Sequence, residues 1–471
     1  MELWRLARTA RLSYDGAEIG QKRGGWQARI SRQQNFARVV IFPRAIENNA
    51  VTARGCVIKK AAMLPRRNFL RTLAAASLAP SLRAQDAEKF PPVRTITRGP
   101  KFHWFAYYDK FQFDPTDRFV LAHEVDFEHR SPTADDVIRV GMVDLQDGDK
   151  WIELGESRAW NWQQGCMLQW VPGTASTVMW NDREGDHFVC HILDVKSGKK
   201  RTIPHPIYAL SPDGSWGISP DFRRLNDTRP GYGYAGVPDP NRDVLAPEDA
   251  GIWKTDMETG KQSLLLSFAD VAKVEQPGGF SNGAKHWFNH LLVAPDKKRF
   301  TFLHRWRGEA EGKSWKTRQF TVGVDGKDLH LLNPSGRVSH FVWRDATHIL
   351  AYAGWDEQVW RFQVFEDRTN KAEPIEGMLP VDGHCTYLPG NEWILCDTYP
   401  DAERNQKPYL FHLPTGRLHL LGKFHSPKEY TGEWRCDTHP RGSRSGKFAC
   451  IDSPHAGGRQ LHLIDLRPIT G

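Results

Sequence analysis

Histidine recurs at one kind of position along this 471-residue chain, within or just before a short run of apolar residues. An imidazole binds metal ions and exchanges protons near neutral pH, so a repeated histidine can build a site for either chemistry. A single histidine of this kind is usually a core residue with a local partner, whereas five copies in equivalent places call for a shared role. The five are His103, His290, His340, His384 and His439.

One of these segments also carries a carboxylate. Asp437 lies two residues before His439, and side chains alternate along a strand, so both are expected on the same face. A set of imidazoles and one carboxylate suits manganese, iron, zinc or calcium-like ions, and ligand type alone does not choose among them.

Seven copies of one turn-and-strand unit accompany the histidines. Each copy opens with a turn rich in Pro, Asp or Gly and continues into a β-rich run. Helical periodicity is nearly absent, and units of roughly 40 to 80 residues are typical of propeller blades. We therefore predict an all-β protein, a seven-bladed β-propeller. The copies begin near Asp114, Val171, Ser211, Ala294, Arg344, Leu388 and Pro440.

This fold would bring distant histidines together. The innermost strands of all blades line one central channel, so equivalent positions face a common space. A polar insertion at 223–247, rich in Arg and Tyr, is expected on a rim, where propellers place binding loops. The last strand, 460–466, is expected to close the ring by pairing with N-terminal material.

Composition divides the chain into four stretches. Residues 1–62 have scattered Arg and no repeat, which predicts disorder or an upstream extension of the coding frame. Residues 63–84 form a predicted export signal, 85–100 a predicted linker, and 101–471 the propeller.

The export signal is predicted from Arg66-Arg67-Asn-Phe-Leu70, which precedes the apolar run 72–79. This arrangement resembles bacterial twin-arginine signals and predicts a periplasmic location. Export would permit disulfides, for which Cys385 with Cys396 and Cys436 with Cys450 are candidates, alongside buried free thiols.

The net charge of +8 comes from the N-terminal region. Residues 1–83 hold 16 Lys/Arg against 4 Asp/Glu, which leaves 48 basic and 52 acidic residues in the remainder. A mildly acidic body argues against nucleic acid as a partner. No apolar run is long enough for a membrane span.

Four segments resemble those of oligogalacturonate lyases, seven-bladed propellers that cleave pectin-derived oligouronides with a bound manganese-type ion. Asn289-His290-Leu is similar to their Gly-His-Pro catalytic-base segment, and Phe302-Leu-His304 to the Cys-His strand that follows it. Ser339-His340-Phe-Val-Trp is similar to their Thr-His-Glu-Phe-Trp metal segment. Asp437-Thr-His439-Pro is similar to their His-x-His-Pro ligands, with Asp437 in place of the first histidine.

The resemblance runs from about His103 to Leu466 and is best over the last four blades. The family's glutamine ligand falls near Trp434, and its catalytic arginine has no obvious match. The resemblance implies metal-assisted β-elimination on acidic, uronic-acid-containing oligosaccharides, with a divalent ion, manganese in the family. It implies the ligands His340, His384, Asp437 and His439.

Catalytic and substrate-binding roles follow from the same chemistry. His290 is the expected base, and an arginine is expected to pair with a substrate carboxylate in bidentate fashion. Arg224 and Arg229 are the catalytic candidates. The expected substrate-binding residues are His103, Tyr108, Arg223 and His304.

Two other functions fit the same fold. A non-catalytic periplasmic propeller of the TolB type would bind protein or glycan. A glycoside hydrolase would need two carboxyl groups flanking the scissile bond. Its candidates are Glu124, Asp126, Glu128, Asp397 and Asp401.

Overall fold

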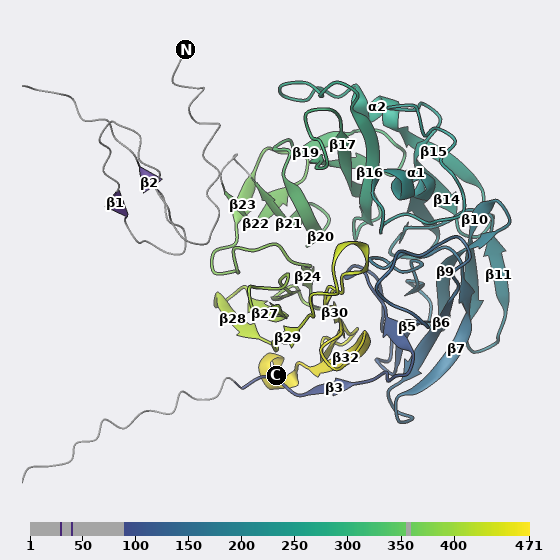
Figure 1. Cartoon of the computed structure of the whole chain (residues 1–471), viewed down its shortest axis with the longest axis vertical. Coiled ribbons are helices and arrows are strands. Elements are labelled where there is room, and N and C mark those ends of the chain that lie inside the picture. Colours follow the sequence, from purple (N-terminus) through teal and green to yellow (C-terminus); the bar gives the residue numbers. More distant parts are fainter. Residues whose placement is uncertain (1–28, 31–38, 41–88, 355–358) are drawn as a thin grey trace, which may run out of the picture. The chain divides into compact units, whose positions relative to one another are not determined.

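Seven four-stranded antiparallel sheets surround a central axis in the computed structural model, which describes residues 29–30, 39–40, 89–354 and 359–471 (Figure 1). All seven sheets belong to one unit, residues 83–471, so the prediction of a seven-bladed β-propeller is confirmed. In the other unit, β1 (Arg29–Ile30) and β2 (Val39–Val40) pair antiparallel. Disorder is predicted for residues 1–62 and an export signal for residues 63–84. Apart from β1 and β2, these residues lie outside those that the structure describes.

Along the chain, each of the first six sheets is built from the axis outward, as the labelled strands of the later sheets show (Figure 1). The first sheet contains β4 (Phe102–Trp104), β5 (Phe119–Val125), β6 (Ile138–Asp144) and β7 (Lys150–Ser157). The second contains β8 (Gln169–Trp170), β9 (Thr177–Glu184), β10 (His187–Asp194) and β11 (Lys200–Ile203). The third contains β12 (Ala209–Leu210), β13 (Trp216–Ser219), β14 (Gly251–Asp256) and β15 (Gln262–Ser267).

The second half of the ring follows the same order. The fourth sheet contains β16 (Lys285–Val293), β17 (Arg299–Arg307), β18 (Lys316–Gly323) and β19 (His330–Asn333). The fifth contains β20 (Val338–Trp343), β21 (His348–Gly354), β22 (Trp360–Glu366) and β23 (Ala372–Pro374). The sixth contains β24 (Thr386–Tyr387), β25 (Trp393–Cys396), β27 (Tyr409–His412) and β28 (Arg417–Leu420).

The seventh sheet joins the two ends of the propeller. It contains β30 (Arg441–Gly442), β31 (Phe448–Ser453), β32 (Gln460–Asp465) and, as its outer strand, β3 (Val93–Thr95). Val93 pairs with Ile464, and the Thr97 hydroxyl donates to Gln460 Oε1 at 2.7 Å. The predicted ring closure therefore occurs. The stretch 85–100 is not simply a linker, because it supplies this strand.

Broad aromatic side chains fill the space between the first two sheets. The Trp104 ring lies 5.5 Å from the Trp160 ring and 5.2 Å from the Trp162 ring, between centroids, and all three are buried. Their edge contacts exclude water from the wedge between two twisted sheets. The tryptophan-rich composition thus stabilises contacts between neighbouring blades.

The innermost strand of the first sheet is interrupted. β4 pairs with the far end of β5, whereas Phe113 forms a bridge with Val120 near its start. The residues between these two pairings, 105–111, leave the sheet. Asp452 fixes the beginning of this excursion by accepting hydrogen bonds from the backbone of Phe105 and Ala106, the latter at 2.8 Å. This axial segment, residues 105–111, lies at the centre of the ring.

Several short elements lie outside the seven sheets. A two-stranded sheet pairs β26 (Asn405–Gln406) with β29 (Phe424–His425). The helices are α1 (Phe222–Thr228), α2 (Phe268–Ala272), α3 (Arg467–Thr470) and a 3₁₀ turn at Gly432–Trp434. Among the described residues, none of these helices has the length and apolarity needed to cross a bilayer.

All six cysteines of the propeller are buried thiols without a disulfide partner. Neither Cys385 with Cys396 nor Cys436 with Cys450 is bonded, so the disulfide alternative is wrong for both pairs. Burial raises the pKa of the Cys190 and Cys385 thiols well above the usual value, which keeps them protonated and inert.

Candidate active site

Four of the five recurring histidines meet at one end of the axis. The centroids of neighbouring rings are 6.1 Å apart for His290 and His340, 4.1 Å for His340 and His384, and 4.1 Å for His384 and His439. They come from four successive sheets. We call these four residues the histidine cluster.

Local irregularities turn these side chains into the channel. The pairing of β16 with β17 shifts between Asn289 and Leu292, and that of β20 with β21 shifts between Val338 and Phe341. Such bulges re-aim a side chain away from the regular alternation of the strand. His384 and His439 instead lie two residues before short inner strands, and His439 has a positive φ of 38°.

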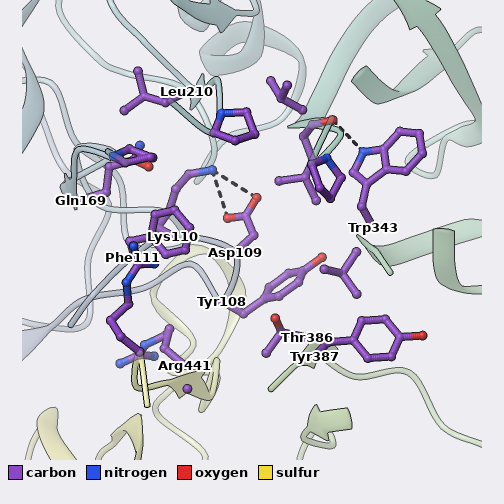
Figure 2. Close-up of a pocket in the computed structure, with 18 of the residues that line it drawn as sticks. Tyr108, Asp109, Lys110, Phe111, Gln169, Leu210, Trp343, Thr386, Tyr387 and Arg441 are labelled. Carbon is purple, nitrogen blue, oxygen red and sulfur yellow. Dashed lines mark hydrogen bonds and ion pairs between the residues drawn. The ribbon is translucent and has the colours of Figure 1, made fainter. Parts of the chain in front are cut away.

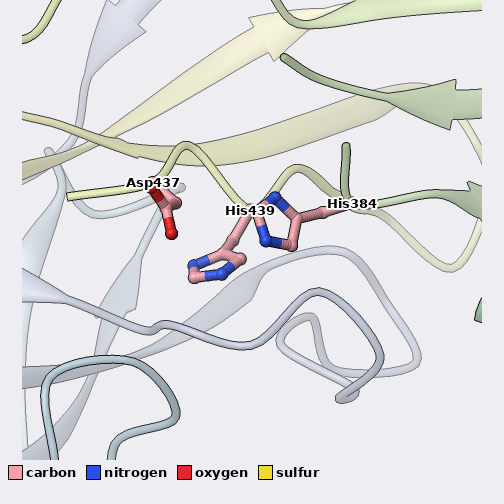
Figure 3. A group of neighbouring side chains, drawn as sticks. All are labelled: His384, Asp437 and His439. Atoms are coloured by element: carbon pink, nitrogen blue, oxygen red, sulfur yellow. The ribbon is translucent and has the colours of Figure 1, made fainter. Parts of the chain in front are cut away.

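Three residues of this region could hold a metal ion. One ligand atom from each of His384, Asp437 and His439 lies within 4.8 Å of the others, and all three residues are buried (Figure 3). The Nε2 atoms of His384 and His439 are buried without a hydrogen-bond partner. Buried orphan nitrogens beside a carboxylate fit a divalent cation, and three protein ligands leave positions open for substrate.

Carboxylates behind the histidines fix two of the rings. Asp397 Oδ1 lies 2.9 Å from His384 Nδ1, and Asp382 Oδ1 lies 3.0 Å from His340 Nδ1. Ligand histidines in metal sites commonly have such a carboxylate on the other nitrogen, because it orients the ring and increases its basicity. The metal-binding prediction for His340 remains a prediction: its ring adjoins His384, but it is not one of the three residues whose ligand atoms converge.

Charge is unevenly distributed among the rings. Burial would lower the pKa of His384, but the Asp397 carboxylate overcomes this and the pKa is raised. Burial and the neighbouring His384 hold the pKa of His439 well below its usual value. Burial also lowers the pKa of His340, against the pull of Asp382. A proton in the cluster is therefore held mainly at His384.

Polar side chains and two arginines, Arg305 and Arg229, surround His290. Its Nδ1 lies 2.5 Å from the Tyr107 hydroxyl, and Tyr208 and Gln164 lie slightly farther away. Burial and then the Arg305 charge hold the pKa of His290 well below its usual value. A neutral imidazole at physiological pH is the form that can accept a proton.

A cavity of about 630 Å³ opens onto His290 and His340. Two of its arginines have no carboxylate partner among the described residues: Arg305 has unpaired Nε and Nη1 atoms, and Arg229 has an unpaired Nε. Burial and the Arg229 charge lower the pKa of Arg305 to about 10, so it is still a cation near neutral pH. Other wall residues of this histidine-side cavity are Tyr232, Trp315, Asp382 and Tyr399.

An arginine and a tyrosine connect this cavity to His384, Asp437 and His439, which we call the metal-binding trio. Arg435 donates to Asp437 Oδ2 and to the Tyr232 hydroxyl, each at 2.7 Å. Burial would raise the pKa of Tyr232, but Arg435 and Arg229 outweigh it and the pKa is lowered. The Tyr232 hydroxyl is therefore more acidic than usual. It accepts the hydrogen bond from Arg435, so its own hydrogen is not engaged in that bond.

His103 does not belong to the histidine cluster. Its two nitrogens contact Gln460 Oε1 at 2.9 Å and Glu124 Oε2 at 3.1 Å. β4 is an inner strand, but the side chain points toward the closing strand β32, and the axial segment occupies the channel instead. His103 is thus held between the first and seventh sheets, apart from the histidine cluster, and its substrate-binding role stays a prediction.

His304 and Tyr108 are also occupied by the fold. Arg318 donates to His304 Nδ1 at 3.0 Å and the other nitrogen contacts His286 Nδ1 at 2.8 Å, while the His304 side chain is fully buried. The Tyr108 hydroxyl donates to the Phe341 carbonyl at 2.9 Å. The Tyr108 ring instead packs on His340 and His384, so neither residue offers a polar group to a substrate.

The three candidate arginines lie in the insertion after β13 and have different surroundings. Arg224 lies inside α1, where its guanidinium donates to four backbone carbonyls and to Asp239, so its expected catalytic role is wrong. Arg223 forms a bidentate pair with Asp221, the helix N-cap, and is occupied there. Only Arg229, one residue past the helix, reaches the cavity.

Three of the five hydrolase candidates are engaged by separate partners. Glu124 binds His103 and Arg139, Asp401 closes a turn at Asn405, and Asp397 supports the histidine cluster. In the lining of the histidine-side cavity the carboxylates are Asp382 and Glu311. Asp382 is held by His340, and Glu311 accepts from the Gly308 amide.

The sequence-based predictions did not include Arg305, Arg435 or Asp382 as site residues. Two of them could have been found by the alternation used for Asp437, because Arg435 and Asp382 precede Asp437 and His384 by two residues. Arg305 carries no such signal, since β17 is buried along almost its whole length.

Two solved structures similar to this chain are oligogalacturonate lyases. One, in complex with manganese, has 15% identity and a TM-score of 0.58 over 80% of this chain and 93% of its own. The other, from Vibrio parahaemolyticus, has 13% identity and a TM-score of 0.56 over 79% and 93%. TolB from Acinetobacter baumannii matches with 11% identity and a TM-score of 0.36, over 75% and 83%.

Sequence comparison adds no further assignment. No protein-family profile matches the chain, and no curated protein matches it. At these identities, the structural likeness establishes the propeller fold that the chain shares with the two oligogalacturonate lyase structures.

Proposed function

We propose that this protein is a lyase that cleaves uronic-acid-containing oligosaccharides by metal-assisted β-elimination. The single observation that carries the proposal is the placement of His290, a buried imidazole of lowered pKa, in one cavity with two arginines that lack carboxylate partners. A base beside unused cations is what removal of a proton next to a carboxylate requires.

The reaction breaks two bonds and forms one. The bond from the carbon α to the carboxylate to its hydrogen breaks, its electron pair forms a carbon–carbon double bond, and the glycosidic C–O bond at the β position breaks. His290 accepts the proton. Arg305 and Arg229 pair with the substrate carboxylate and stabilise the negative charge that develops on it.

The leaving oxygen needs a proton. Tyr232 lines the same cavity, accepts from Arg435 and keeps its own hydroxyl hydrogen, which makes it the candidate donor. Its lowered pKa supports this role, because a more acidic hydroxyl gives up its proton more readily.

The metal-binding trio lies next to these groups. His384, Asp437 and His439 would hold a divalent cation, and His340 adjoins them. Such an ion supplies Lewis-acid polarisation of a carboxylate oxygen. Imidazole and carboxylate ligands are compatible with manganese, the ion named in one similar structure.

We also propose that the enzyme is exported to the periplasm through the twin-arginine pattern at Arg66-Arg67. Its partner there would be an acidic oligosaccharide. Without cleavage, the same arrangement would suit a glycan-binding propeller.

The test is incubation of the purified protein with a panel of acidic oligosaccharides, with and without chelator. We expect absorbance of the unsaturated uronate that disappears with chelator and returns with manganese. New reducing ends without that absorbance would indicate a hydrolase instead. Absence of cleavage across the panel, with binding retained, would replace the lyase with a glycan-binding function.

A further inference from the structure

A second cavity is bordered by residues 108–111 of the axial segment and by the ends of the inner strands (Figure 2). Its volume of about 530 Å³ is within the range of small-molecule sites. It is lined where inner strands end, for example at Leu210, Val293 and Trp343, and it shares no lining residue with the histidine-side cavity. We call it the axial cavity.

An ion pair projects into the axial cavity. Lys110 Nζ lies 3.0 Å from Asp109 Oδ1 and 3.1 Å from Oδ2, and the two side chains are only 3% and 6% exposed (Figure 2). Among the described residues the carboxylate has no other side-chain partner. Burying such a pair with so few hydrogen bonds is unfavourable unless further polar groups complete it.

A third polar group at the cavity is incompletely bonded. Gln169 lines the axial cavity, is 4% exposed, and its buried Nε2 has no hydrogen-bond partner. Buried donors without acceptors are costly in folded proteins, so this amide also points to an occupant. The occupant must donate to Asp109 and accept from Lys110 and Gln169.

The remaining wall is largely apolar and aromatic, with two arginines, Arg441 and Arg444. Phe111, Trp343 and Leu292 supply rings and aliphatic surface. Arg441 is paired with Asp452 at 2.7 Å, and Lys110 with Asp109. The Arg444 guanidinium lies over the Phe111 ring, 3.7 Å from its centroid. An anion would be repelled by the buried Asp109 carboxylate, and a purely apolar ligand would leave the polar groups unbonded.

We propose that the axial cavity is a second binding site, for a neutral polyhydroxylated ligand of saccharide size. Hydroxyl groups both donate and accept, so one sugar ring can bond Asp109, Lys110 and Gln169 at once while its apolar face packs on the aromatic wall. This site does not depend on the lyase reaction, since none of its residues belongs to the histidine-side cavity.

The axial segment contacts both sites and separates one from the other. Tyr107 and Tyr108 contact rings of the histidine cluster, whereas Tyr108, Asp109 and Lys110 line the axial cavity. A ligand in the axial cavity would therefore leave the entrance to His290 open.

Saturation-transfer NMR on the whole protein with D-galactose and D-glucose as probes tests the site. We expect binding by the unaltered protein and an affinity at least about tenfold weaker in Asp109→Asn/Lys110→Met, which removes both charges together and leaves neither charge unpaired. Gln169→Leu should also weaken binding, and His290→Ala should not. Circular dichroism verifies that each variant is folded.

The opposing results are distinct. The proposal is overturned if neither neutral sugar binds, if binding survives both axial-cavity variants, or if His290→Ala abolishes it. None of these results bears on β-elimination, which is measured separately with acidic oligosaccharides.

Discussion

His384 Nδ1 and Asp397 Oδ1 lie 2.9 Å apart, with side chains that are 2% and 0% exposed. The same carboxylate accepts the Thr438 hydroxyl and the backbone amide of His439. One buried aspartate thus fixes the ring of one candidate metal ligand and the backbone of another. The two come from neighbouring sheets, so Asp397 determines the geometry of the metal-binding trio.

Replacing this aspartate should weaken metal binding. We expect Asp397→Asn to lower the affinity for manganese by about 10- to 100-fold, because an amide orients the imidazole less well and does not increase its basicity. Isothermal titration measures the affinity. Asp401→Asn is the matched control, since Asp401 closes a turn at Asn405 and should leave the affinity unchanged. Equal affinities in all three proteins would contradict this role.

Removal of the candidate base should separate catalysis from metal binding. We expect His290→Gln to reduce kcat for an acidic oligosaccharide by at least about 100-fold, the lower range of general-base contributions. Manganese affinity should be unchanged, because His290 is not one of the converging ligands. A variant that retains full activity would show that another group takes the proton.

Arg305 should control both substrate binding and the acid limb of the pH profile. Arg305→Met removes a charge that lowers the pKa of His290, so that pKa rises. The acid limb of kcat/KM should therefore move to higher pH, and KM should rise because a carboxylate partner is lost. Arg307→Met, on the same strand but outside the cavity lining, is the control. An unshifted limb in Arg305→Met would refute the coupling.

The outer strand of the seventh sheet should be needed for stability. A protein beginning at residue 101 lacks β3 and leaves the edge of β32 unpaired, so its Tm should fall by several degrees relative to one beginning at residue 89. Thermal unfolding followed by circular dichroism compares the two. Identical Tm values would show that ring closure adds nothing.

Three buried histidines outside the site should make the fold acid-sensitive. Burial lowers the pKa of His123 to about 3 and of His286 and His462 to about 4. Below pH 6.5 the unfolded chain therefore binds protons that the folded protein does not, and stability falls with pH by up to about 1.4 kcal/mol per unit for each histidine. Urea unfolding between pH 7 and pH 4.5 measures the slope.

His286→Gln is the control for this dependence. It should reduce the slope by the contribution of one histidine, because glutamine does not titrate. A flat dependence in the unaltered protein, or the same slope in the variant, would contradict the assignment.

Local sequence was enough to predict the ring. Pro/Asp/Gly turns followed by β-rich runs specify short strands, and such strands bury their faces only by packing on neighbours in a closed array. The four histidines in or just before inner strands could be placed on the axis for the same reason, since the inner strands of all blades converge there.

The partners of each side chain could not be predicted in this way. His103 occupies an inner strand like the others, but the axial segment 105–111 takes its place in the channel, and Gln460 from the other end of the chain binds it. Arg224 and Arg229 lie five residues apart, but a short helix buries one and directs the other to the cavity.

The sequence by itself determined the repeated strands, the turns between them and the equivalent positions of the histidines, because these depend on residues close together in the chain. Only the tertiary structure decided which histidines meet, which arginines lack a carboxylate and where the two cavities lie. Those features depend on contacts between sheets, and such contacts form between residues tens to hundreds of positions apart.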